Sequence, residues 1–179
     1  LDNLTISYGQ KVTNNKLTQI TFERVVHQIK SGSWKKQTDL LQQASNKQEF
    51  KRLHLSYFNM GIFKDDKRSK FKLQSSQHLL FDYDDLTPEK LTELKSQLQA
   101  DNKVFCVFTS PSRNGLKVIY KLSDPITDHQ TFTNVYKYYA QEFKVNLDAE
   151  PDKTSDAARP CFMSYDPDIY VNLESEPLP

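Results

Sequence analysis

The sequence predicts an α+β domain in which a mainly antiparallel sheet is packed by helices on one side. Two observations carry this prediction. Segments rich in aromatic and β-favouring residues alternate with amphipathic segments of helical period along the second half of the chain. The 179 residues are 37% hydrophobic and 26% charged, which is typical of an ordinary globular domain of this length. We therefore expect a single structural domain, with an N-terminal helical segment (1–55) packed on an α+β core (56–179).

The N-terminal segment is predicted to hold three helices. Thr21, followed by apolar residues at helical spacing and by Gly32, predicts a first helix near 21–31. Residues 36–44 and 46–53 are rich in Gln and Lys and carry few apolar positions. We expect these two stretches to form a polar helical cap outside the core.

The predicted core begins with a hairpin-like pair of strands at 55–63 and 70–81, separated by the charged residues 64–68. Thr87 and Pro88 then predict the start of a helix that runs to about residue 99. Strands are expected at 104–108 and 116–122, on either side of a segment of turn-forming residues. A last amphipathic helix is indicated by the aromatic residues between 132 and 143.

Composition excludes some function classes and leaves others open. No apolar run approaches the roughly 20 residues that span a bilayer, so we expect no membrane partner. Cys106 and Cys161 lie in apolar surroundings, as buried free thiols do, and predict a cytoplasmic location. A net charge of +1 gives no strong global attraction to nucleic acid, so any such binding must come from local patches.

Two carboxylates stand at the end of an apolar strand. Asp82 and Asp84 are one residue apart, so both side chains emerge on the same face of that strand. Carboxylates this close repel each other, and a hard divalent cation such as Mg²⁺ or Mn²⁺ relieves the repulsion. A solvated strand end without any metal explains the same spacing equally well.

The turn between the next two strands is a candidate phosphate site. It offers hydroxyls, backbone N–H groups around a glycine and a positive charge, and a lysine follows on the next strand. The residues concerned are Ser110, Ser112, Arg113, Asn114, Gly115 and Lys117. The segment lacks the spacing of a P-loop, and a polar hairpin turn is the alternative.

Further charged residues could join these groups. Asp148 follows the last helix and could bring a third carboxylate to the same site, and Arg159 lies downstream among acids. A surface loop of ion pairs is the alternative for both residues. A basic strip interleaved with Phe63 and Phe71 suits single-stranded nucleic acid, although two acids dilute it and a solvated hairpin tip fits as well. The strip comprises Lys64, Lys67, Arg68, Lys70 and Lys72.

Three segments in order resemble the motifs of the archaeo-eukaryotic primase, or primase-polymerase, superfamily. They are residues 81–84 (FDYD), residues 110–117 (SPSRNGLK) and the Leu-Asp pair that ends at Asp148. More narrowly, the first two segments and residues 159–167 (RPCFMSYDP) resemble the primase-like, VirE N-terminal-type domains of mobile-element and phage replication proteins. The resemblance covers about residues 20–172.

The resemblance implies an RRM-like sheet, with Asp82, Asp84 and Asp148 as ligands of Mg²⁺ or Mn²⁺. It also implies that Ser112, Lys117 and Arg159 face the phosphates of a nucleoside triphosphate, with Lys117 taking a catalytic position. The partners it implies are nucleoside triphosphates, a single-stranded DNA template and a helicase domain or subunit. The implied reaction is in-line nucleotidyl transfer assisted by paired metals.

This sequence departs from the superfamily at Lys117, where its second motif usually ends in histidine. A lysine side chain is a point charge whose pKa and reach differ from those of histidine, which puts efficient polymerisation in doubt. Two hypotheses from different classes follow: a template-directed primase-polymerase, and a degenerate primase-like module that binds nucleotide or nucleic acid and acts with a helicase. An aspartate-nucleophile phosphatase ranks below both because Leu86 stands where threonine or valine is expected.

Overall fold

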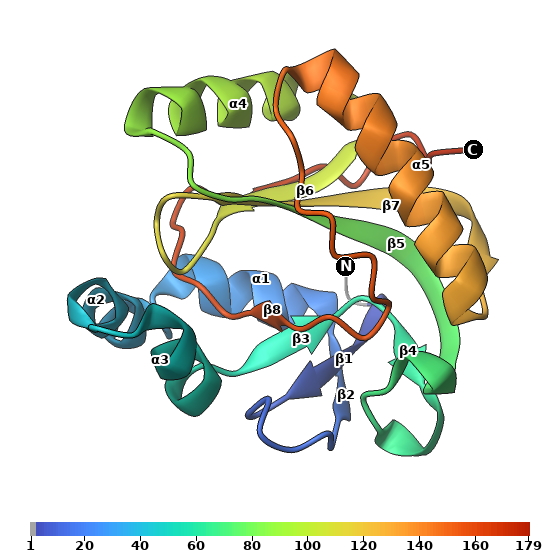
Figure 1. Ribbon diagram of the computed structural model, residues 1–179, viewed down its shortest axis with the longest axis horizontal. Helices are drawn as coiled ribbons and strands as arrows, with labels where there is room; N and C mark the ends of the chain where they lie inside the picture. Colours follow the sequence, from blue (N-terminus) through green and yellow to red (C-terminus); the bar gives the residue numbers. More distant parts are fainter. Residues whose placement is uncertain (1–2) are drawn as a thin grey trace.

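Two antiparallel sheets and five α-helices make up the part of the chain that this computed structural model describes, residues 3–179 (Figure 1). The larger sheet has five strands in the order β4-β5-β7-β6-β9, and the smaller has four in the order β2-β1-β3-β8. The strands of the larger sheet are β4 (Ile62–Phe63), β5 (Leu73–Tyr83), β7 (Leu116–Ile126), β6 (Val104–Thr109) and β9 (Tyr170–Val171). Those of the smaller sheet are β2 (Thr18–Thr21), β1 (Thr5–Gly9), β3 (Tyr57–Asn59) and β8 (Cys161–Phe162). The predicted α+β class with a mainly antiparallel sheet is confirmed.

Helices lie on both faces of the larger sheet. In Figure 1, α4 (Pro88–Ala100) and α5 (His129–Leu147) cover one face, while α1 (Phe22–Ser31) and the smaller sheet cover the other. The prediction that helices pack on one side was therefore incomplete. The reason is the three buried apolar residues of α1, Phe22, Val25 and Ile29, which need a second apolar surface and find it against the face of β6 and β7.

Helix boundaries follow the local capping signals. Thr21 caps α1 by accepting a hydrogen bond from the Arg24 N–H, and Gly32 ends it in the left-handed conformation. Thr87 caps α4 in the same way through the Lys90 N–H. The two polar helices are α2 (Lys35–Gln43) and α3 (Lys47–His54), close to their predicted bounds.

The N-terminal segment differs from the prediction because it contains strands as well as helices. β1 and β2 form a hairpin, and β1 also pairs with β3 from the predicted core. The predicted hairpin between 55–63 and 70–81 is correspondingly wrong in its first half. β3 joins the smaller sheet, and β4 alone, two residues long, pairs with β5.

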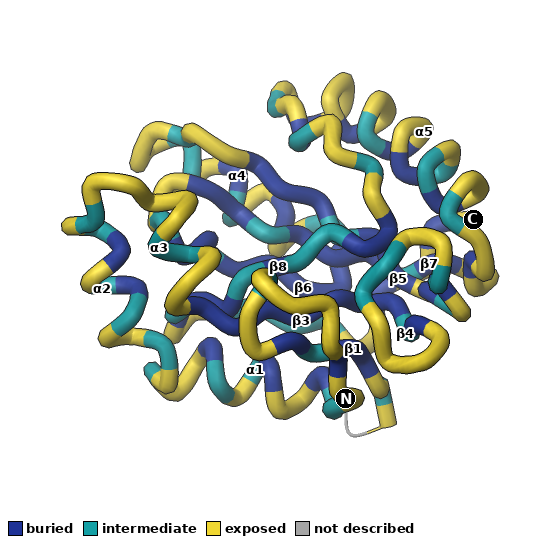
Figure 2. The backbone as a smooth tube through the Cα atoms, turned by 60° about the horizontal axis from the view of Figure 1, so that its bottom comes forward, coloured by how far each residue is buried: buried dark blue, intermediate teal, exposed yellow. Residues whose placement is uncertain are grey.

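Two apolar clusters hold the layers together. One lies mainly between the larger sheet and α4 and α5, and it includes Phe81, Tyr120 and Phe143. The other lies between the same sheet, α1 and the smaller sheet, and it includes Phe58 and Phe108. Figure 2 shows that buried residues concentrate on the strands of the larger sheet, whereas α2 and α3 are largely exposed.

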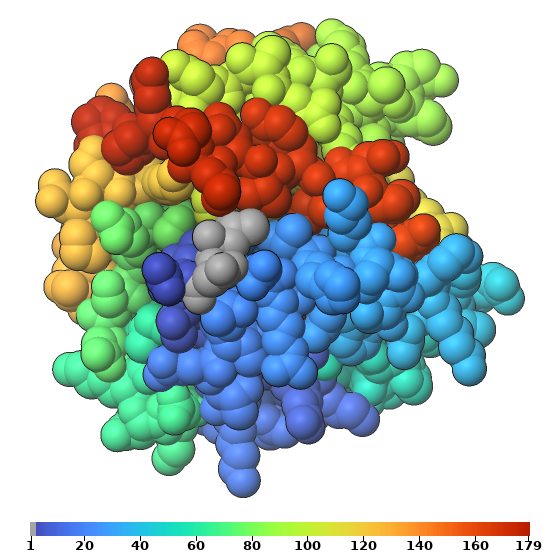
Figure 3. Space-filling view, turned by 180° about the vertical axis from the view of Figure 1, so that it is seen from behind, coloured from blue at the N-terminus to red at the C-terminus, as the bar shows by residue number. Residues whose placement is uncertain are grey.

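The segment after α5 crosses the molecule to close the fold. It contributes β8 to the smaller sheet and β9 to the larger one. In Figure 3 its last part lies between α4 and the N-terminal part of the chain. Asp166 fastens it, since its carboxylate accepts from Lys95 Nζ and from the Thr109 N–H, each at 2.7 Å. None of the described helices has both the length and the apolar character needed to cross a bilayer.

Short 3₁₀ turns connect β4 to β5. They are η1 (Lys64–Asp66) and η2 (Lys70–Lys72), and they carry the basic strip that the sequence predicted. The strip lies at the start of β5, whereas Asp82 and Asp84 lie at or just beyond its end. Because β5 has eleven residues, about 30 Å of strand separates the two places.

Candidate functional site

A cleft of about 460 Å³ opens at the end of β5, on the side of the sheet that faces α3. Its walls come from five segments: helix α3, the end of β5 with the residues just after it, the turn between β6 and β7, the start of β7, and the stretch from α5 into β8. Its lining residues are Lys47, Gln48, Lys51, Asp82, Asp84, Asp85, Ser112, Asn114, Lys117, Asp152, Arg159, Pro160 and Phe162. Four acids and four bases are among them, so the charges of the cleft balance.

Asp82 is the centre of the charge network. It lies directly across the ladder from Lys117 on β7, and its side chain is only 4% exposed. Lys117 Nζ lies 2.5 Å from Asp82 Oδ1, and Arg159 Nη2 lies 2.9 Å from Oδ2. Arg159 also donates to Asp152 Oδ2 at 3.0 Å. One buried carboxylate thus holds two cations, and one of these cations holds a second acid.

The charged form of each of these cations is favoured in the cleft. Burial is the largest single effect on Lys117 and lowers its pKa, but the charge and hydrogen bond of Asp82, together with the other nearby groups, outweigh it and the pKa is raised. Arg159 follows the same pattern, because burial is outweighed by Asp82 and Asp152. Both side chains therefore present fixed positive charge toward the cleft at neutral pH.

Asp84 differs from Asp82 in being exposed and in having no ion pair among the described residues. Partial desolvation raises its pKa, the charge of Lys117 lowers it, and the charge of Asp82 raises it again, for a net increase. A carboxylate with a raised pKa and no cationic partner gains from a cation brought into the cleft. Asp84 is thus the acid in this cleft best placed to accept one.

The turn between β6 and β7 is held tightly against the end of β5. The Ser110 N–H donates to the Gly115 carbonyl at 2.8 Å, and the Leu86 N–H donates to the Asn114 carbonyl at 2.8 Å. A β-carbon on Gly115 would lie 2.5 Å from the Tyr83 carbonyl oxygen. Only glycine allows this approach, which brings Ser112 and Asn114 to the cleft wall.

Three residues of the predicted phosphate turn do not line the cleft. Ser110 is buried and Gly115 packs beneath the turn, so both are structural. Arg113, at φ +65°, forms an ion pair with Asp39 of α2. Gln42, also on α2, donates to the Pro111 carbonyl at 3.0 Å. Helix α2 therefore anchors the turn, and the Arg113 charge is directed away from the cleft.

The third predicted acid is also placed elsewhere. Asp148 ends α5 in the left-handed conformation at φ +47°, is exposed, and is not part of the cleft lining. Asp152, four residues later, occupies the cleft instead, where its N–H donates to the Asp82 carbonyl at 2.7 Å. This backbone contact fixes the segment after α5 against the end of β5.

Helix α3 contributes residues that the sequence analysis assigned to a polar cap. Lys47, Gln48 and Lys51 face the cleft from this helix. Burial and the charges of Lys117 and Arg159 lower the pKa of Lys51, against the opposing effect of Asp84 and Asp82, with burial the largest cause. The lysines of α3 were a detectable signal, but their position opposite β5 depends on tertiary packing.

The fit of a divalent metal can be judged from the donor atoms. Asp82 Oδ1 touches Lys117 but has no aligned hydrogen-bond donor among the described residues, so it keeps a free lone pair. No group of three or more His, Cys, Asp or Glu side chains with metal-binding geometry occurs in residues 3–179. The donors therefore suit a Mg²⁺-type ion that brings further oxygen ligands with it, and they do not form a complete protein cage.

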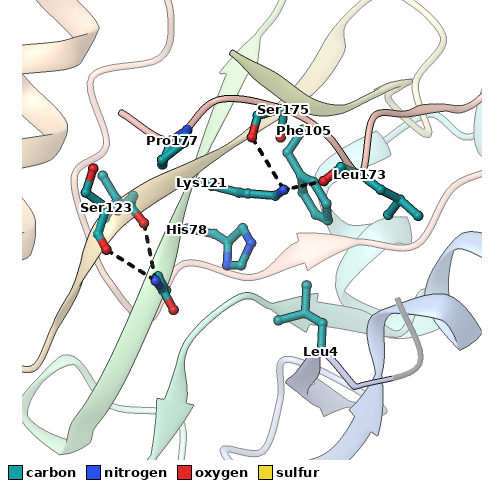
Figure 4. A pocket seen from close by; sticks show the side chains of 10 residues that line it. Leu4, His78, Phe105, Lys121, Ser123, Leu173, Ser175 and Pro177 are labelled. Atoms are coloured by element: carbon teal, nitrogen blue, oxygen red, sulfur yellow. Dashed lines mark hydrogen bonds between the residues drawn. The ribbon is translucent and has the colours of Figure 1, made fainter. Parts of the chain in front are cut away.

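A second cavity, of about 570 Å³, lies on the same face of the larger sheet, near the middle of β5 and β7 (Figure 4). Its wall includes His78 and Lys121, which are partners across the ladder as Asp82 and Lys117 are. Lys121 Nζ donates to the Leu173 carbonyl at 2.7 Å, which ties the C-terminal segment to the sheet. Burial and the charge of Lys121 lower the pKa of His78 to about 4.

Fold and cleft together define an α+β domain with a balanced acidic and basic cleft at the end of strand β5. The family described as "BT4734-like, N-terminal domain" matches residues 51–171, and the chain belongs to this family. The matched region includes every cleft residue except Lys47 and Gln48. No curated protein sequence matches the chain.

Two solved structures resemble the fold at low sequence identity. The polymerase domain of Mycobacterium tuberculosis Ligase D in complex with DNA has a TM-score of 0.42 and 13% identity, over 65% of this chain and 49% of that one. The AEP domain of the Cyanophage S-2L primase-polymerase has a TM-score of 0.45 and 14% identity, over 91% of this chain and 74% of that one. The chain spans about half the length of the first.

Proposed function

We propose that the chain is a nucleotidyltransferase domain of the primase-polymerase kind, which binds a nucleoside triphosphate with a divalent metal and extends a strand on a single-stranded DNA template. The observation that carries this proposal is the cleft itself. It sets Asp82 and Asp84 against Lys117, Arg159 and Lys51 within one cavity. The sequence resemblance supports the same reading.

The charges explain why metal and nucleotide would bind together. Asp82 is already neutralised by Lys117 and Arg159, so a bare cation is attracted mainly by Asp84 and Asp85, the two cleft acids that form no ion pair in the described part of the chain. A triphosphate offers new acceptors to Lys117, Arg159 and Lys51, and it frees Asp82 oxygens as these cations turn toward phosphate. Balanced charge in the cleft therefore favours the metal-nucleotide pair over either component alone.

The residues divide into two roles. Asp84 and Asp82 would hold Mg²⁺ or Mn²⁺, which supplies stabilisation of the charge that develops on the attacking and leaving oxygens. Lys117, Arg159, Lys51 and the Ser112 hydroxyl would bind and orient the phosphates. Burial of Lys117 beside the acid keeps its charge fixed, which suits charge stabilisation and not proton transfer.

The deciding experiment compares template-directed synthesis by wild type and by Asp84→Asn. Asp84 is the better choice because it is exposed and makes no ion pair in the described part of the chain, so the variant should fold normally. We expect loss of product together with loss of metal-dependent triphosphate binding. Equal synthesis by the two proteins would remove the catalytic assignment of the acid pair.

A degenerate module that binds nucleotide without catalysis is the second candidate. Two observations favour it: Asp82 is occupied by two cations, and Asp148 does not join the acid pair. Saturable, metal-dependent triphosphate binding without product on any template would support it over the first candidate. In either case a helicase partner and the VirE-type relationship are predictions from the resemblance. Co-purification of a helicase with this chain tests the first of them.

A further inference from the structure

The turn region before β5 forms a second charged surface, remote from the cleft. It comprises η1, η2 and the residues between them, and in Figure 1 it lies at the opposite end of β5 from the turn that follows β6. Residues 64–72 hold five cations and two acids, a surplus of three, in a chain whose net charge is only +1. Much of the uncompensated positive charge is therefore gathered here.

Phe71 gives this surface an exposed aromatic ring. Its residue exposure of 75% is the highest of any large hydrophobic residue in the described chain. The His129 ring meets it edge-on at 4.9 Å between centroids, and Lys70 Nζ lies 5.2 Å from its ring centre. The phenyl ring is thus oriented by a neighbour and flanked by a cation, while most of its surface remains open to solvent.

The five cations of the strip divide into two groups. Arg68 is structural, because it donates to the Tyr57 hydroxyl at 3.0 Å and to the Val12 carbonyl at 3.2 Å. Lys72 is paired with Asp65. The remaining three, Lys64, Lys67 and Lys70, are exposed and have no ion-pair partner in residues 3–179.

The backbone beneath these lysines is held in place. The Arg68 N–H donates to the Asn15 carbonyl at 2.7 Å, and the Leu17 N–H donates to the Asp66 carbonyl at 2.8 Å. These bonds fix the turn against the hairpin of β1 and β2. The aromatic ring and the free ammonium groups are therefore presented by an ordered scaffold, which limits the entropy lost when a ligand binds.

We propose that Phe71, Lys64, Lys67 and Lys70 form a site for single-stranded DNA that is separate from the cleft. The lysines would contact phosphates and the phenyl ring would stack on an unpaired base, the combination by which proteins hold single strands without reading sequence. Duplex DNA offers the same phosphates but no open base face, and an acidic peptide offers no flat ring to stack. The site does not depend on the cleft being catalytic.

The test measures fluorescence anisotropy of a labelled oligothymidylate of about ten nucleotides with the whole chain, without metal or nucleotide. Three phosphate contacts predict that log K falls with log salt at a slope of about −2, and removing one lysine reduces the slope by about 0.7. Phe71→Ala is expected to weaken binding about tenfold with the slope unchanged, because stacking carries no counterion release. Phe71→Trp should retain binding.

Matched controls separate this site from general charge and from the cleft. Tyr138→Ala removes another exposed ring, 61% exposed on α5, and Lys36→Ala with Lys103→Ala removes exposed lysines elsewhere. The assay keeps the cleft out by leaving out metal and nucleotide, and these control variants should bind the strand as wild type does. Wild-type affinity and slope in both Phe71→Ala and Lys67→Ala would overturn the proposal, as would equal affinity for a duplex of the same length. Because Phe71 is exposed, an unchanged urea midpoint will confirm that its variants fold.

Discussion

Replacement of Asp82 by alanine is predicted to destabilise the fold as well as the cleft. The Asp82 side chain is 4% exposed and that of Lys117 is 12% exposed, so the variant leaves a buried ammonium without its partner. Breaking a buried pair in this way costs about 3–5 kcal/mol. Arg159 contributes less to this destabilisation, because its side chain keeps Asp152 as an ion-pair partner and is more exposed than that of Lys117.

The double variant Asp82→Ala with Lys117→Met isolates the cause. With no buried charge left behind, its loss of stability should be smaller, about 1–2 kcal/mol, even though two side chains have changed. The two substitutions should therefore couple by about 2 kcal/mol in a double-mutant cycle. If their effects on the free energy of unfolding simply add, the buried pair is not the cause.

Equilibrium unfolding in urea, followed by circular dichroism, measures these values. For a domain of this size an m value of about 2 kcal/mol/M converts the expected loss in Asp82→Ala into a midpoint shift of about 2 M. A shift below about 0.3 M would refute the reasoning. Loss of activity in Asp82→Ala therefore cannot be assigned to metal binding, whereas the same loss in Asp84→Asn can.

Three further predictions follow from single residues. Gly115→Ala should lower the free energy of unfolding by about 1–3 kcal/mol, because its β-carbon would meet the Tyr83 carbonyl at 2.5 Å; a wild-type urea midpoint would contradict the proposed close approach. His78 has a pKa of about 4 in the folded protein and about 6.5 in the unfolded chain, so the unfolded state binds its proton at the higher pH. The free energy of unfolding should therefore be constant above about pH 6.5 and fall by about 3 kcal/mol by pH 4. His78→Gln should lack this pH dependence. Arg113→Ala removes the ion pair that holds the β6–β7 turn to Asp39, but it removes no residue of the cleft lining. Triphosphate binding measured by calorimetry should therefore weaken only about twofold to fivefold. Complete loss of binding would instead place Arg113 in the cleft.

Local signals in the sequence were sufficient for most helices and long strands. Thr21 and Gly32 bound α1, and Thr87 with Pro88 starts α4, because capping depends on residues a few positions apart. β1 and β2 were missed since each is short and gains stability only by pairing, in the case of β1 with distant β3. Strand partners far apart in sequence leave no local pattern.

The candidate site shows the same division. Asp82 and Lys117 lie opposite each other on β5 and β7, and both line the cleft. Strand alternation predicts the face on which each side chain lies, but the pairing of these two strands is a tertiary contact that no local pattern shows. Asp148 was the acid that the motif order predicted, but it ends α5 outside the cleft lining. Asp152 lines the cleft because its N–H contacts the Asp82 carbonyl, and no sequence pattern predicts that contact. Lys51 could not be predicted, since it reaches the cleft only through the packing of α3.

Binding of a nucleoside triphosphate measured by isothermal titration calorimetry, with and without Mg²⁺, tests the central claim most directly. We expect saturable binding that requires both components, with Mg²⁺ alone showing no measurable heat because Asp82 is already paired. Asp84→Asn and Lys51→Ala should each abolish or strongly weaken it, whereas Phe71→Ala should not change it. Triphosphate binding that is indifferent to Mg²⁺ and to Asp84 would contradict the account.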